Sequence, residues 1–65
     1  MTFIIKRRRG DEFFAGFGPA PKYAAKWTPN AADAAAGDYS WAKGQALCMI
    51  SAGDANVQQK PVRVS

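Results

Sequence analysis

Apolar and charged runs alternate over the first seventeen residues in a pattern typical of two strands joined by a turn. The segments "FIIK" and "EFFAGF" are rich in phenylalanine and isoleucine, and Gly10 and Asp11 lie between them. A dipeptide that begins with glycine suits a two-residue hairpin loop. The pattern therefore predicts a β-hairpin over residues 3–17, in which Arg9 lies opposite Glu12.

This predicted register makes each face of the hairpin apolar near its base and cationic near its tip. Arg8 would face Phe13 and Arg7 would face Phe14 across the ladder, and residues that face one another share one side of the sheet. We therefore expect the cations of residues 6–9 to project into water. An exposed pair of Arg9 with its opposite carboxylate would contribute well under about 1 kcal/mol.

A third strand is expected over residues 22–28, "KYAAKWT", with Tyr23, Ala25 and Trp27 on one face. The preceding "GFGPAP" reads as a loop. It lacks the third glycine of a phosphate-binding loop, and no helix follows it directly.

Two helices are expected after the third strand. Thr28 before Pro29 is a good pairing of a helix cap with a first helical residue, and it predicts a helix of about two turns that is closed by Gly37. Ser40 is expected to cap a longer helix over residues 41–52.

The run "ALCMI", residues 46–50, is open to a second interpretation as a buried strand, because short apolar runs discriminate poorly. The segment "NVQQKPVRV" predicts a final strand in which Val62 and Val64 alternate with Arg63. Pro61 cannot donate a ladder hydrogen bond, so this strand should lie at an edge or pair only after the proline.

These elements together predict a single α+β domain over residues 1–65. We expect a small antiparallel sheet of three to four strands, which begins with the β-hairpin, and one short and one longer helix packed on one face. A chain of 65 residues buries a modest core. A homodimer would be one way to bury more surface.

The composition limits the chemistry that the side chains can perform and the cellular location that we expect. Cys48 is the only cysteine and histidine is absent, so no intrachain disulfide can form and no imidazole can shuttle protons. Cys48 lies in an apolar run and is expected to be a buried small hydrophobe. The apolar run near the N-terminus is too short for a signal peptide, and no segment approaches a membrane span. We therefore expect a cytoplasmic protein without membrane contact.

The five acidic residues are scattered and carry no recognisable catalytic or metal-binding pattern. They lie at expected turns and helix ends, at Asp11, Glu12, Asp33, Asp38 and Asp54. Adjacent strand residues point to opposite faces, so the one neighbouring pair does not form a dyad. The sequence thus predicts no enzyme activity, no metal and no cofactor. The Arg-Gly-Asp tripeptide coincides with the turn signal, and backbone geometry accounts for it better than adhesion does.

The net charge of +4 is concentrated, since four of the nine cations form one block. Such a block favours an anionic partner. One hypothesis is a protein with an acidic surface, anchored by an aromatic side chain, because arginine and large aromatics are enriched at binding hot spots. The other is nucleic acid, with phosphate contacts and bases stacked on exposed phenylalanines. The candidate binding residues are Lys6, Arg7, Arg8, Arg9, Tyr23, Trp27 and Tyr39.

The order of these elements resembles small proteins encoded by bacteriophages and prophages. The resemblance rests on "FIIK", a glycine turn, "EFFAGF", then "WT" before a short alanine-containing helix and "YS" opening a helix that contains Ala46. The proline-rich "GPAPKYAAK" and the alanine-dense helix depart from it. The chain is also similar in size and simplicity to anti-CRISPR inhibitors of bacterial defence. The resemblance implies a small sheet with helices on one face, a mobile-element origin, and inhibition of a CRISPR-Cas subunit as one function.

Overall fold

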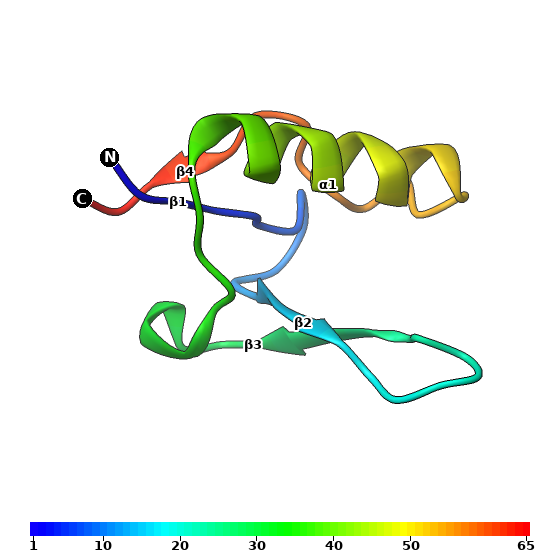
Figure 1. The fold of residues 1–65 in the computed structure, drawn as a ribbon. Helices are drawn as coiled ribbons and strands as arrows, with labels where there is room; N and C mark the ends of the chain where they lie inside the picture. Colours follow the sequence, from blue (N-terminus) through cyan, green and yellow to red (C-terminus); the bar gives the residue numbers. More distant parts are fainter.

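A computed structural model describes all 65 residues. The elements follow one another as β1 (Phe3–Ile4), β2 (Phe13–Phe17), β3 (Ala25–Thr28), a 3-10 turn η1 (Ala31–Asp33), α1 (Tyr39–Ser51) and β4 (Val62–Arg63). β1 pairs with β4 and β2 pairs with β3, both antiparallel. Figure 1 shows α1 and the β2–β3 hairpin on opposite sides of β1. The α+β class is confirmed, but the strands form two small sheets instead of one, and only one α-helix is present.

The segment from Thr2 to Arg8 runs through the middle of the fold and is hydrogen-bonded on both of its edges. Its partners on one edge are Val64, Gln58 and Asn56, and its partners on the other are Gly37, Phe14 and Glu12. Because helix and sheet cover it from both sides, Ile4 and Ile5 are both buried although they point in opposite directions.

The core lies where α1 meets this central segment. The helix presents Ala42, Ala46 and Met49, which are spaced four and three residues apart and so lie on one stripe. The two alanines let the helix come close to the apolar side chains of Ile5 and Val57, which belong to the same cluster. Burial of this stripe is what holds the helix on the sheet.

Local signals at both ends explain the bounds of α1. Asp38 is the N-cap, and its Oδ1 accepts a hydrogen bond from the Trp41 amide at 2.8 Å. The predicted cap, Ser40, lies inside the first turn. The helix ends in a Schellman motif, in which the Gly53 amide donates to the Ile50 carbonyl with Gly53 at φ 108°. The longer helix is thereby confirmed, and the strand interpretation of residues 46–50 is wrong.

The first turn is present, but its predicted register is wrong. The Arg7 amide donates to the Glu12 carbonyl at 3.0 Å, so the loop is residues 8–11 and not Gly10 and Asp11 alone. Gly10 has φ 88°, a conformation that side chains disfavour. The shift is an even number of residues, so Arg7 and Phe14 still share a face as predicted. The second strand pairs with β3 from Phe13 onward, and beyond Phe14 it no longer pairs with the first strand.

The expected two-turn helix after Thr28 is also wrong. Only the 3-10 turn η1 forms, and Asn30 caps it through a hydrogen bond from the Ala32 amide to its Oδ1. The chain then extends, because the Ala35 amide pairs with the Phe14 carbonyl and Gly37 pairs with β1. These long-range contacts override the helix propensity of the alanines.

The remaining strand predictions are confirmed in part, because β3 begins at Ala25 and leaves Tyr23 in the preceding loop, and β4 ends at Arg63 and leaves Val64 outside it. β3 lies within residues 22–28, with Ala25 and Trp27 partly buried and Lys26 exposed. "GFGPAP" forms the end of β2 and the turn that leads to β3. β4 starts directly after Pro61, so pairing begins where the missing amide no longer matters.

Candidate functional site

The three consecutive arginines have different environments. The Arg7 guanidinium lies 4.1 Å from the centre of the Trp27 ring, and its Nε lies 3.5 Å from Oε1 of Glu12 without forming a hydrogen bond. The Arg7 side chain is 24% exposed. The prediction that every cation of the block projects into water is therefore wrong for Arg7, and the predicted pair of Arg9 with Glu12 is replaced by Arg7 with Glu12.

Lys6 is held against its own loop. Its Nζ donates to the carbonyls of Arg7 and Gly10, both at 3.3 Å. The ammonium group therefore stabilises the loop through two backbone carbonyls. It is less available to a partner than the ammonium group of a freely extended lysine.

Arg8 and Arg9 are exposed, and neither forms an ion pair. Asn56 fixes their backbone: its carbonyl accepts from the Arg8 amide at 2.9 Å, and its Oδ1 accepts from the Arg9 amide at 2.9 Å. The Asn56 side-chain amide also donates to the Arg9 carbonyl at 3.4 Å. Two unpaired guanidinium groups thus extend from a backbone that is held by hydrogen bonds. Because this backbone is already ordered, less conformational entropy is lost when the arginines bind a partner.

Arg8 lies between two hollows of the surface. One, of about 550 Å³, is lined by Arg8, Arg9, Ala55 and Asn56. The other, of about 560 Å³, runs between the C-terminal half of α1 and the segment that leads to β4, and we call it the basic groove. The basic groove is lined by Arg8, Leu47, Ile50, Ala55, Val57, Gln58, Gln59 and Lys60.

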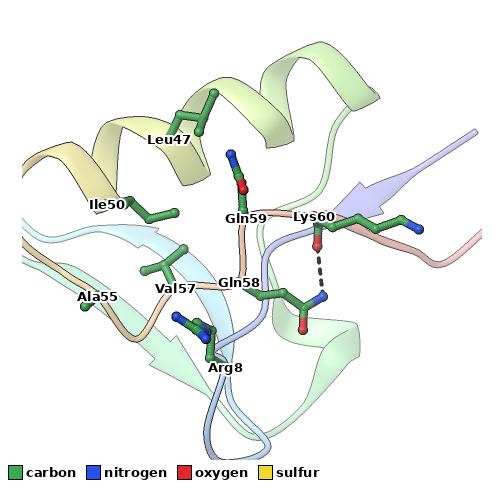
Figure 2. Close-up of a pocket in the computed structure, with 8 residues that line it drawn as sticks. All are labelled: Arg8, Leu47, Ile50, Ala55, Val57, Gln58, Gln59 and Lys60. Carbon is green, nitrogen blue, oxygen red and sulfur yellow. Dashed lines mark hydrogen bonds between the residues drawn. The ribbon is translucent and has the colours of Figure 1, made fainter.

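The basic groove combines apolar side chains with cations and contains no carboxylate. In Figure 2, Ile50 and Val57 approach one another across it, and the Arg8 guanidinium lies beside Val57. Leu47 is 39% exposed on the helix side. Lys60 stands at the other end with its ammonium group directed away from Arg8, and its carbonyl accepts a hydrogen bond from Gln58 Nε2 at 2.9 Å.

The predicted aromatic residues do not gather around the exposed arginines. Trp27 packs edge-on against Phe14, with the ring centroids 5.9 Å apart. Among the arginines, it contacts Arg7, whose side chain is directed inward. Tyr23, 61% exposed, lies in the loop between β2 and β3. Tyr39, 47% exposed, starts α1 and packs edge-on against Phe3 at 5.3 Å. None of the three lines the basic groove.

Sequence reasoning missed the other half of this surface. Asn56, Leu47 and Lys60 are far from the arginine block along the chain, and Asn56 is 47 positions from Arg9. No local pattern marks such residues as neighbours of the block. The one available signal was the short turn "DANV" after a helix ending in glycine, which indicates a loop but not its partner.

The environment of Cys48 differs from the prediction. Its side chain is exposed on α1 and has no disulfide partner. The helix is apolar on most of its circumference, so its pattern did not distinguish the buried stripe from the outer face.

Further properties concern metals and membranes. No three cysteine or carboxylate side chains come together in a group that could hold a metal ion. None of the helices combines the length and the apolarity needed to cross a bilayer.

Comparisons with models of protein families, with curated proteins and with solved structures found no match to this chain.

Proposed function

We propose that this chain is a non-catalytic protein-binding module whose exposed Arg8 and Arg9 contact an acidic surface of a partner protein. The observation that carries the proposal is the position of Arg8: an unpaired cation at the end of a groove that also exposes Leu47 and part of Ile50. Apolar contact area beside an arginine is characteristic of protein interfaces.

Nucleic acid is the second candidate, because two unpaired guanidinium groups line one hollow. Its stacking component is left to Phe17, which is 49% exposed, and the partly buried Phe13, since Phe14 is only 2% exposed. If Arg8 and Arg9 alone contacted phosphate, the salt slope would be about −1.8 and affinity would fall roughly 12-fold between about 50 and 200 mM salt. With all four cations of the block, the slope would be about −3.6.

The partner's identity is proposed from the sequence resemblance. It suggests a host defence complex in the cytoplasm, with a CRISPR-Cas subunit as the target to test first. Self-association into a homodimer is a separate proposal that sedimentation velocity tests directly.

The central experiment is an affinity purification from a lysate of the bacterial host, followed by mass spectrometry. The wild type is compared with the double variant Arg8→Glu and Arg9→Glu. Arg7 stays unchanged, because its reversal would disturb the contacts with Glu12 and Trp27. The charge-matched control is Lys22→Glu with Lys26→Glu, two exposed cations of the β2–β3 hairpin.

We expect a protein partner that the wild type and the hairpin control retain and the arginine variant loses. Retention by the arginine variant would show that this surface is not the interface. A fluorescence-anisotropy titration with duplex and single-stranded oligonucleotides at about 50 and 200 mM salt provides the second arm. Tight, strongly salt-dependent binding there, without a protein partner, would favour nucleic acid instead.

A further inference from the structure

We propose that the basic groove receives a short acidic segment of the partner, in which one large aliphatic side chain is flanked by carboxylates. This inference rests on the proposed function and names the kind of segment that the surface accepts. The aliphatic side chain would lie over Leu47 and Ile50, and a neighbouring carboxylate would pair with the Arg8 guanidinium.

Charge complementarity identifies the occupant. Every ionised side chain that lines the basic groove is cationic, and no carboxylate of this chain lines it. The one ion pair of the fold uses Arg7 and Glu12, so it leaves Arg8 and Lys60 unpaired. An acidic segment would gain charge-assisted hydrogen bonds to a guanidinium whose planar donor array matches a carboxylate.

The apolar side chains make a purely electrostatic occupant a poor fit. Leu47 is exposed, and Ile50 is partly buried and packs on the core cluster. A side chain placed over Leu47 and Ile50 would withdraw their exposed apolar surface from water, whereas Val57 is already buried. Phosphate or a polyglutamate tract offers no group for this part of the groove, whereas a leucine flanked by glutamates does.

The groove also offers neutral donors that suit a peptide backbone. The Gln58 side-chain amide donates one hydrogen bond to the Lys60 carbonyl at 2.9 Å. Gln58 and Gln59 are neighbours in sequence and both line the groove. Side-chain amides at a groove wall can bond to the carbonyls of an extended peptide. The occupant is therefore inferred to be a segment of polypeptide chain.

Three fluorescein-labelled peptides test the inference in anisotropy titrations. The first has a single leucine flanked by glutamates, the second has alanine in place of the leucine, and the third has glutamines in place of the glutamates. We expect the first to bind, and each of the others to bind about tenfold more weakly, since each loses one of the two contacts.

Two protein variants separate apolar anchoring from charge. Leu47→Lys adds a cation but removes the apolar side chain, so we expect it to weaken binding of the leucine peptide about tenfold. Arg8→Gln should weaken it by a similar factor. Cys48→Ser, a neighbouring exposed residue outside the groove, is the matched control and should bind as the wild type does. Circular dichroism checks each fold, and Leu47→Gln replaces Leu47→Lys if the latter does not fold.

The outcomes distinguish this inference from the proposed function. If Leu47→Lys strengthens binding, if leucine and alanine peptides bind equally, or if no peptide binds the wild type, the inference about the groove is wrong. The proposed function survives each of these results as long as the partner pull-down still depends on Arg8 and Arg9. An oligonucleotide that binds more tightly than the leucine peptide, and more tightly still to Leu47→Lys, would also overturn the inference.

Discussion

The Arg7 guanidinium lies over the Trp27 ring, 4.1 Å from its centre, although Arg7 is the first of three consecutive arginines. Successive side chains of an extended segment point to opposite sides, so the next residue, Arg8, is directed outward. One arginine therefore belongs to the packing of the β2–β3 sheet on the central segment, and the other two belong to the surface.

This difference predicts unequal effects on stability. Arg7→Ala removes the cation–π contact and the packing of the arginine stem on Trp27, and should lower the free energy of unfolding by about 0.5–1 kcal/mol. Arg8→Ala should change it by less than about 0.5 kcal/mol. Urea denaturation followed by tryptophan fluorescence measures both. Equal losses for the two variants would contradict the inward position of Arg7.

The side chain of Asn56 predicts a residue-specific change in hydrogen exchange. Asn56→Ala removes the acceptor of the Arg9 amide but leaves the backbone carbonyl that accepts from the Arg8 amide. With a net hydrogen-bond contribution of about 1 kcal/mol, the Arg9 amide should exchange about fivefold faster. NMR-detected exchange resolves the two amides, and the Arg8 amide is the internal control. Unchanged exchange at Arg9 would show that the side-chain contact does not hold the loop.

The N-cap of α1 predicts different effects for two nearby polar residues. Asp38→Ala leaves the Trp41 amide without its acceptor and should destabilise the protein by about 1 kcal/mol. Ser40→Ala, within the first turn, should change stability by less than about 0.5 kcal/mol. Thermal unfolding followed by circular dichroism compares them. A larger loss for Ser40→Ala would place the cap where the sequence alone suggested.

Two glycines of the same region predict opposite effects of alanine. A Cβ at Gly37 would approach Cε3 of Trp41 to 2.7 Å, so Gly37→Ala should destabilise by about 1–3 kcal/mol through overpacking. A Cβ at Gly44 would meet no atom within 4 Å, so Gly44→Ala should stabilise the helix by about 1 kcal/mol. Midpoints of thermal unfolding should move in opposite directions. A higher midpoint for Gly37→Ala would contradict the close contact of Trp41 with Gly37, and a lower midpoint for Gly44→Ala would contradict the open space beside Gly44.

Local sequence signals were sufficient to predict the end of α1, the start of β4 and the position of β3. Gly53 stops α1, Pro61 delays β4, and the alternation around Lys26 produces β3. These features depend on a few adjacent residues. They could be predicted because short-range backbone preferences are strong at glycine, at proline and in alternating strands.

The features that failed depend on contacts between distant segments. A two-residue and a four-residue loop are both compatible with "RRGDE", and the choice places Arg7 against Trp27 and Arg9 against Asn56. The alanine-rich segment after Asn30 extends because Phe14 and β1 offer it partners. The proposed site keeps part of the predicted block of cations, but the division of this block into inward and outward arginines and its neighbour Leu47 were not visible in the sequence.

The pairing of Phe3 with Arg63 has a consequence for how the chain reaches its native state. β1 and β4 are far apart along the chain, so this contact is long-range and the central layer cannot close until β4 has been made. The β2–β3 hairpin, whose partners are close in sequence, can form earlier. Until β4 arrives, the edge of the isoleucine-rich strand stays open to pairing with other chains, so this edge offers a route to aggregation during biosynthesis.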